Sequence, residues 1–247
     1  MIETNEIMTH LTQSTVLHII VILLLFWAGL RGLQWFFPWL TVQIPSRFRL
    51  YVLPLLPVPE LLLTWPVLFA ALVCTALLAT QPVMSARESA ENRRTDRNTM
   101  WLILAMSAFG QVVSLVEWAY LAGAPTQLDA FALLGALLML GGLAFRVWAI
   151  RTLDRAFSAT VQIKQDQQLI TNGPYRWLRH PSYTGAWSLM VGVALLFHSW
   201  AGLLVMGPGM LWVYARRIDT EETTLETAFG QAYSDMKRTT WRMLPGW

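Results

Sequence analysis

Long apolar runs separated by short polar segments dominate the chain. The runs cover residues 16–37, 50–79, 99–122, 128–150 and 183–214. Each of the first four has at least the roughly 20 residues that an α-helix needs to cross a bilayer. The last run is too long for one upright helix, and the polar pair His198 and Ser199 divides it. It therefore predicts a helical hairpin over residues 182–215, with His198 at its tip.

The run at residues 50–79 is rich in proline, which breaks or kinks helices. We expect a broken helix here, with Glu60 between the prolines. A carboxylate within a membrane is a candidate functional group. Equally, the prolines could place Glu60 at the membrane interface, where it bonds to freed backbone. Glu117, near the end of the third apolar run, has no assigned role. The prolines are Pro54, Pro57, Pro59 and Pro66.

The composition of the chain indicates that these runs are membrane helices. Hydrophobic residues make up 55% of the chain and charged residues 13%, against about 25% charged in soluble domains. The net charge of +3 comes with an arginine-rich loop at residues 81–98. Such a loop is typical of cytoplasmic connectors and not of nucleic-acid binding. Cys74, the only cysteine, excludes an intrachain disulfide, and four dispersed histidines argue against a metal site.

We therefore predict an all-α, polytopic transmembrane helical bundle with about five or six spans. Residues 1–150 would supply four spans, and residues 151–247 a cofactor-binding catalytic region that faces the cytosol. The start of the chain lacks a basic segment, so the first run is expected to remain as a membrane helix. After the hairpin, apolar residues recur at spacings of three and four over residues 221–237. This spacing predicts a C-terminal amphipathic helix.

A polar segment at residues 169–185 interrupts the apolar pattern just before the hairpin. Asn172, Gly173 and Pro174 form a turn sequence, and Pro181 suits the first position of a helix. The N–H groups at that helix start attract anions, and Arg179 and His180 stand beside it. The alternative interpretation is a well-capped helix with aromatic residues at the membrane interface.

A second polar group follows the hairpin directly. Arg217 and Glu221 lie four positions apart on one helix face, with Glu222 beside them. By themselves they could be a surface ion pair. Folding of the hairpin, however, would bring them close to His180 and form a pocket with cationic and anionic walls. Such a pocket suits S-adenosylmethionine. The cofactor's carboxylate needs the cationic wall, and its ribose hydroxyls and sulfonium need the anionic wall. A G-x-G-x-x-G dinucleotide motif is absent.

The motif G-x-Y-x-x-x-R-H-P-x-Y-x-G, joined to E-E-x-x-L and F-G-x-x-Y, resembles the isoprenylcysteine carboxyl methyltransferase family and its phospholipid methyltransferase relatives. The resemblance covers about the last third of the chain. It implies an integral-membrane methyltransferase that uses S-adenosylmethionine. It gives Arg217 and Glu222 catalytic roles, with Arg217 beside the acceptor. The cofactor-binding residues that it implies are Gln162, Lys164, Tyr175, Arg179, His180, Pro181, Tyr183, Gly185, Glu221 and Glu222.

The acceptor is less defined, because lipid, prenyl-cysteine and small-thiol methylating enzymes share these motifs. A carboxylate on a prenyl-cysteine-like or other lipidic molecule fits best, because it needs no general base and the sequence offers none. The alternatives are methyl transfer to a small thiol or a phospholipid amine. Two further alternatives are not methyltransferases. They are an NADPH-dependent, sterol-type membrane reductase and a non-catalytic membrane adaptor.

Overall fold

The structure is a computed structural model that describes residues 48–80, 99–153 and 169–247. The predicted first span at residues 16–37 and the arginine-rich loop at 81–98 lie outside the described residues. Within the described part the elements are helices, with one isolated parallel bridge between Leu178 and Trp241. The α-helices are α3 (Phe48–Leu55), α4 (Trp65–Ala79), α6 (Thr99–Val116), α7 (Ala130–Leu153), α8 (Pro181–Leu196), α9 (Trp200–Leu204), α10 (Met210–Phe229) and α11 (Gln231–Thr239).

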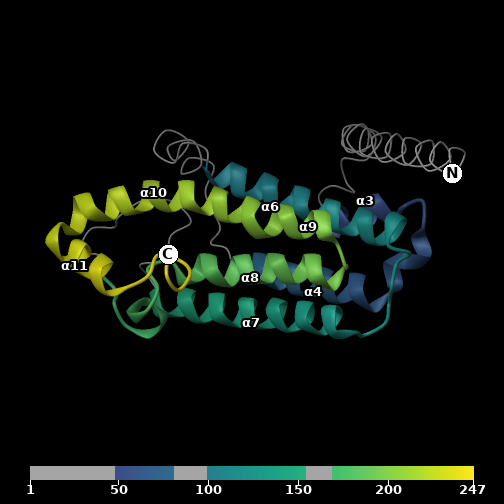
Figure 1. The fold of residues 1–247 in the computed structure, drawn as a ribbon, viewed down its shortest axis with the longest axis horizontal. Coiled ribbons are helices and arrows are strands. Elements are labelled where there is room, and N and C mark those ends of the chain that lie inside the picture. The colour runs from purple at the N-terminus through teal and green to yellow at the C-terminus, as the bar shows by residue number, and fades with distance from the viewer. Residues whose placement is uncertain (1–47, 81–98, 154–168) are drawn as a thin grey trace, which may run out of the picture.

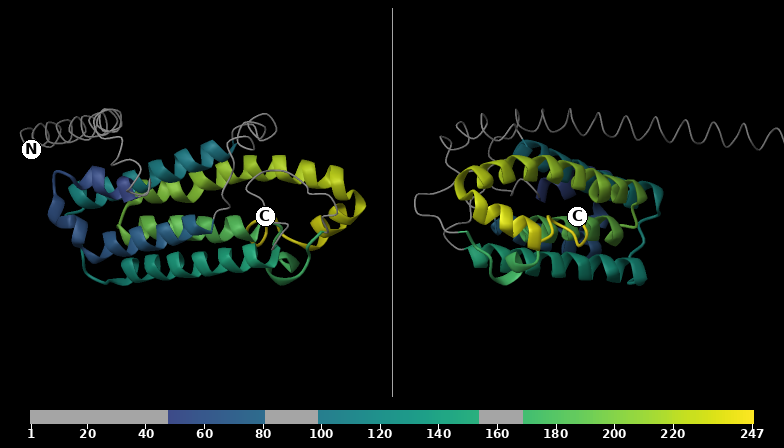
Figure 2. Two further views of the ribbon diagram at one scale, coloured as in Figure 1. Left: turned by 180° about the vertical axis from the view of Figure 1, so that it is seen from behind. Right: turned by 60° about the vertical axis from the view of Figure 1, so that its left-hand side comes forward.

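The long helices run side by side as an elongated bundle, as Figures 1 and 2 show. Two described helices are long and apolar enough to cross a membrane, Thr99–Leu121 and Ala130–Leu153. A third apolar helix, Trp65–Leu77, is shorter. This criterion rests on length and composition alone, and core helices of soluble proteins also satisfy it.

The second apolar run is a broken helix, as its prolines predict. Helix α3 ends at Leu55, a short 3-10 helix spans Pro59–Leu63, and α4 begins at Trp65. The carbonyl of Pro54 accepts a hydrogen bond of 2.6 Å from the hydroxyl of Tyr120. Glu60 is exposed within the 3-10 helix.

The hairpin turns between α8 and α9, at the polar pair that predicted it. His198 has a φ of +49° there, and Ser199 caps α9 by accepting a hydrogen bond of 2.8 Å from the backbone N–H of Gly202. Glu117, in a π-helical turn that extends α6, accepts hydrogen bonds from the Ser199 hydroxyl (2.5 Å) and the Ala201 N–H (3.0 Å). Glu117 thus stabilises the start of α9, since a carboxylate there satisfies free N–H groups.

The second arm of the hairpin continues much further than the predicted apolar run. A π-helical turn at Val205–Gly209 contains Pro208, and α10 then runs on to Phe229. The predicted helix over residues 221–237 is therefore not a single element. Gly230 interrupts it with a φ of +52°, a conformation that glycine adopts without strain. Helix α11 then folds back toward the bundle (Figure 1).

Helices α7 and α8 approach closely because glycines face each other across their contact. A Cβ atom on Gly142 would lie 2.5 Å from the carbonyl oxygen of Gly185, and one on Gly185 would lie 2.5 Å from the carbonyl oxygen of Gly142. Side chains at these positions would push the two backbones apart. This contact sets the position of the start of α8 against α7.

We expect Gly142→Ala to destabilise the protein by about 1–3 kcal/mol, the usual cost of an added methyl group in a filled contact. Its neighbour Gly141 is the matched control. Outside the neighbouring backbone of α7 itself, no described atom lies within 4 Å of a Cβ placed there, so Gly141→Ala should be neutral or stabilise the helix by up to about 1 kcal/mol. Thermal or denaturant unfolding of the purified protein in detergent measures both. Equal effects of the two substitutions would contradict the proposed contact.

Candidate functional site

The site begins at the N-terminus of α8. His180 precedes the helix and Pro181 occupies its first turn, where its missing N–H costs no hydrogen bond. The C-terminal tail pairs with this segment. The N–H of Arg179 donates to the carbonyl of Trp241 (2.9 Å), and the N–H of His180 donates to the carbonyl of Arg242 (3.0 Å). The tail therefore holds the segment before α8 in an extended form.

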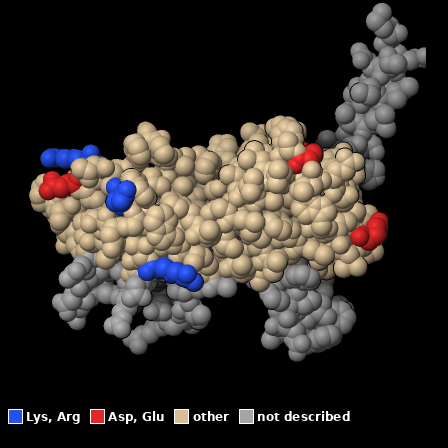
Figure 3. Space-filling model, turned by 90° about the horizontal axis from the view of Figure 1, so that it is seen from below, with Lys and Arg blue, Asp and Glu red and all other residues tan. Residues whose placement is uncertain are grey.

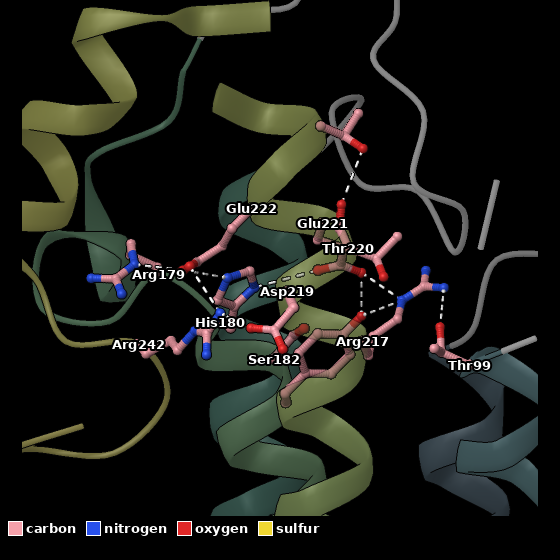
Figure 4. Close-up of polar contacts among 12 residues, drawn as sticks. Thr99, Arg179, His180, Ser182, Arg217, Asp219, Thr220, Glu221, Glu222 and Arg242 are labelled. Carbon is pink, nitrogen blue, oxygen red and sulfur yellow. Dashed lines mark hydrogen bonds and ion pairs between the residues drawn. The ribbon is translucent and has the colours of Figure 1, made fainter. Parts of the chain in front are cut away.

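Two adjacent carboxylates from α10 enclose the His180 side chain, as Figure 4 shows. Its Nδ1 lies 3.4 Å from Oε2 of Glu221, and its Nε2 lies 3.3 Å from Oε1 of Glu222. Arg179 donates from Nε to the same Glu222 oxygen at 2.8 Å. His180 and Glu222 are both buried, with about 5% of each residue exposed. The two polar segments on either side of the hairpin thus meet in one charged cluster.

Arg217 forms the opposite side of this cluster. Its Nε donates to Oε1 of Glu221 (2.8 Å) and to the hydroxyl of Tyr183 (3.2 Å), and its Nη1 donates to Thr99 (3.3 Å). The Tyr183 hydroxyl also donates to Glu221. The Tyr183 ring stacks between His180 and Tyr214, with centroid distances of 5.9 and 5.0 Å. Charged groups and stacked aromatic faces therefore lie together.

Charge pairing controls the titration of this cluster. Burial alone lowers the pKa of His180, but hydrogen bonds to Glu221 and Glu222 and their negative charges outweigh burial and raise it. Burial alone raises the pKa of Glu221, but His180 and Arg217 lower it to about 2. The pKa of Glu222 is also well below its usual range, since His180 and Arg179 oppose the effect of burial. Glu221 and Glu222 are therefore ionised at neutral pH, and their charges favour the protonated form of His180.

These shifts predict that stability has a maximum in mildly acidic solution. A raised histidine pKa gives stability that is complete below the ordinary value of 6.5 and is lost as the pH rises through the folded-state pKa. The lowered carboxyl pKa values give stability that is complete above 4.5 and is lost as the pH falls toward about 2.

The melting temperature in detergent should therefore fall on both sides of this window. His180→Gln should flatten the fall on the alkaline side, because it removes the titrating group. The same substitution at His198, at the opposite end of the bundle, should leave that fall in place. A wild-type profile that stays flat above pH 6.5 would be contrary to the assignment.

The structure adds charged residues that the sequence analysis did not select. Arg242 donates to Glu222 at 3.1 Å and pairs with Asp219, and Lys237 lies 4.0 Å from Glu222. Arg242 is in the tail that pairs with the segment before α8, and Lys237 is in α11. Asp219 lies between Arg217 and Glu221 in the sequence, but nothing in the sequence marked the basic residues of the tail as partners of Glu222.

Arg146 is a further residue that the sequence analysis did not select. It is 4% exposed and comes from α7. It donates to the carbonyl of Ser182 (3.1 Å) and to the Thr80 hydroxyl (3.2 Å). No carboxylate in the described part of the chain pairs with it. A buried cation without a counter-charge is unusual, and this one lies at the start of α8 beside the cluster.

Two of the predicted site residues lie outside the cluster, and two more lie outside the described residues. Tyr175 is buried in a small apolar group with Ala149, Tyr233 and Met236. Gly185 faces α7, which gives it a packing role that the sequence analysis did not assign. The two predicted site residues outside the described part of the chain are Gln162 and Lys164.

The residues present are suited to S-adenosylmethionine. The Arg242 Nε is buried without a hydrogen-bond partner among the described groups, so it is an available donor for a ligand. Burial and the charge of Glu222 raise the pKa of Tyr233 and keep it a neutral donor. Carboxylates suit ribose hydroxyls and a sulfonium, and arginines suit a carboxylate.

The chain is similar to known methyltransferases. A family model described as phospholipid methyltransferase matches residues 130–232. Protein-S-isoprenylcysteine O-methyltransferase from Dictyostelium discoideum is 31% identical over 135 residues, which cover 53% of this chain and 55% of that protein. The Saccharomyces cerevisiae protein of the same name is 35% identical over 107 residues, 42% and 44% of the two chains. The resemblance to the isoprenylcysteine carboxyl methyltransferase family is thereby confirmed.

The fold is similar to that of a solved membrane methyltransferase structure. The solved structure of the eukaryotic intramembrane Ras methyltransferase ICMT matches with a TM-score of 0.55 and 18% identity, covering 95% of this chain and 94% of that one. By sequence, the chain spans about half the length of the curated relatives it matches. The matched residues 130–232 include α7, the hairpin and α10, and thus most of the charged cluster.

Proposed function

We propose that this protein is an integral-membrane methyltransferase that uses S-adenosylmethionine and methylates the carboxylate of a prenyl-cysteine-like or other lipidic acceptor. One observation carries the proposal. The segment before α8 and the segment after the hairpin meet in a largely buried cluster, in which His180 lies between Glu221 and Glu222 and an arginine pairs with each carboxylate. The names of the matched relatives support methyl transfer over the reductase alternative.

In this proposal the membrane arrangement follows the charge pattern. The protein is multi-pass, with residues 1–150 as the membrane anchor and 151–247 as the catalytic region. On the face shown in Figure 3, the Lys and Arg side chains gather toward one end of the bundle, with an acidic side chain among them, and the opposite end carries acidic side chains. Basic residues favour the cytosolic side of membrane proteins. We therefore place the charged cluster at the cytosolic end.

The cofactor-binding residues in this proposal are those that converge at the start of α8. Glu221 and Glu222 hold the polar and cationic parts of the cofactor, and His180 fixes both carboxylates through its two ring nitrogens. Tyr183 offers an aromatic face. When bound, S-adenosylmethionine supplies an electrophilic methyl group. Gln162 and Lys164 cover the cofactor from the loop before residue 169, as the family resemblance implies.

Arg217 positions the acceptor. Its guanidinium is held by Glu221, Tyr183 and Thr99, so its orientation is fixed before the acceptor arrives. A guanidinium binds a carboxylate through paired N–H donors. A carboxylate acceptor already carries its negative charge, so the protein needs no general base for this reaction. The protein then has to hold the two reactants in line and exclude water from them.

Arg146 is a further candidate for contact with the acceptor. It lies at the start of α8, beside Tyr183, and lacks a carboxylate partner among the described residues. An anionic group that approaches from the membrane side would neutralise it. The acceptor carboxylate would then lie between two arginines from different helices.

One observation favours a second candidate, transfer to a phospholipid amine, because the matching family model is described as phospholipid methyltransferase. Purified protein with methyl-labelled S-adenosylmethionine and a set of acceptors tests both. The acceptors are a farnesylcysteine, phosphatidylethanolamine and a small thiol. A methyl ester releases its label in mild base, whereas N-methyl and S-methyl groups retain it.

Base-labile label on the farnesylcysteine is the expected result. Base-stable label on phosphatidylethanolamine would support the amine candidate in its place. A protein that binds S-adenosylmethionine and labels none of the acceptors would argue against the proposed acceptor classes. A protein that does not bind the cofactor at all would contradict the proposal itself.

A further inference from the structure

The face of α7 turned away from α8 carries an apolar groove. Its residues recur at spacings of three and four and so share one helix face. Gly135 and Gly142, which contact α8, lie on the opposite face of the same helix. The groove has a volume of about 470 Å³, within the roughly 300–1,000 Å³ of small-molecule sites. It is lined by Leu140, Leu143, Ala144, Val147, Trp148 and Arg151.

The groove ends in a cationic and aromatic group at the same end of α7 as the charged cluster. Arg151 is exposed in the last turn of α7. The Trp148 ring contacts the Trp177 ring edge to face, with a centroid distance of 6.2 Å. The guanidinium carbon of Arg176 lies 4.0 Å from the centroid of the Trp177 ring. Two arginines and two tryptophans thus surround one end of an otherwise apolar groove.

This arrangement matches the parts of an anionic phospholipid. Tryptophan is typical of the membrane–water interface, and arginine there binds acidic headgroups. In Figure 3, which views the bundle from the α7 side, the middle of the face carries no coloured charged side chains. An acyl chain along α7 would therefore meet apolar surface, while its headgroup would reach the arginines.

We propose that this groove binds one anionic phospholipid, with an acyl chain along Leu140, Leu143 and Val147 and its phosphate between Arg151 and Arg176. The site lies on the outer face of α7 and is separate from the cluster around His180. The inference depends on the proposed membrane location but not on methyl transfer. It assigns a structural lipid to the end of the helix that also supplies Arg146.

Native mass spectrometry of the full-length protein in detergent tests the site. The protein is titrated with phosphatidylglycerol or with phosphatidylcholine of the same acyl chains, and the dissociation constant of the first bound lipid is measured. We expect phosphatidylglycerol to bind at least about tenfold more tightly, because each arginine near the headgroup contributes about a fivefold gain. The double variant Arg151→Gln, Arg176→Gln should lose this preference.

Two further variants separate the groove from general charge and folding effects. Arg238→Gln, in α11 with a side chain 78% exposed, removes one charge elsewhere and should keep the preference. Ala144→Phe fills the groove at an exposed position without changing charge, and should weaken both lipids. Equal binding of the two lipids by the wild type, or a preference that survives in the double arginine variant, would overturn the proposal. S-adenosylmethionine is omitted, so an inactive methyltransferase would not alter the result.

Discussion

Arg217→Lys is expected to lower methyl transfer at least about 100-fold while leaving cofactor affinity within about threefold of the wild type. Lysine keeps the positive charge beside Glu221 but loses the planar pair of donors that orients a carboxylate. The acceptor would then be held less well in line with the methyl group. Turnover of the labelled farnesylcysteine and calorimetric titration with S-adenosylhomocysteine measure the two quantities separately.

The adjacent residue provides the control. Arg216 is exposed and lies over the Trp212 ring at 5.1 Å, so Arg216→Lys should retain nearly full activity. Arg217→Ala, like Arg217→Lys, should have almost no methyl-transfer activity. It would also remove the arginine partner of the largely buried Glu221, which costs about 3–5 kcal/mol. Turnover near the wild-type rate in Arg217→Lys, with the protein folded, would remove Arg217 from the acceptor site.

His180→Ala is expected to weaken cofactor binding about 10–100-fold, since each hydrogen bond to a charged group contributes about 1.5–3 kcal/mol. The mechanism is indirect, because His180 holds Glu221 and Glu222 in position through its two ring nitrogens. His180→Gln retains one donor and should lie between the wild type and the alanine variant. Calorimetry with S-adenosylhomocysteine gives the affinities, and a melting curve of each variant shows whether it is folded.

His198→Ala is the matched control for this prediction. His198 lies at the hairpin turn, where it bonds to Asp129 at 2.8 Å, far along the bundle from the cluster. Its replacement should leave cofactor affinity unchanged. An unchanged affinity in a folded His180→Ala protein would show that His180 takes no part in the cofactor site.

The sequence indicated the main elements because helix breakers and apolar runs act locally. The prolines around Glu60 predicted the broken second helix, and the polar pair at His198 predicted the turn of the hairpin. The family motifs selected Arg179, His180, Arg217 and both glutamates before any geometry was known. The sequence predicts a separate helix from residue 221, whereas α10 continues from Met210 to Phe229. A charged segment after an apolar run is typical of a new element, which explains the difference. Only Gly230 ends the helix.

By itself, the sequence determined a chain of helices with one hairpin, and it determined the family motifs that contain His180 and Glu222. The tertiary structure alone decided which further groups lie beside that motif. It paired the tail with the segment before α8, turned Gly142 and Gly185 toward each other, and buried Arg146 beside the site. The physical reason is that helix periodicity fixes the face a residue occupies. Contacts between distant segments depend on how those faces pack, which no local pattern encodes.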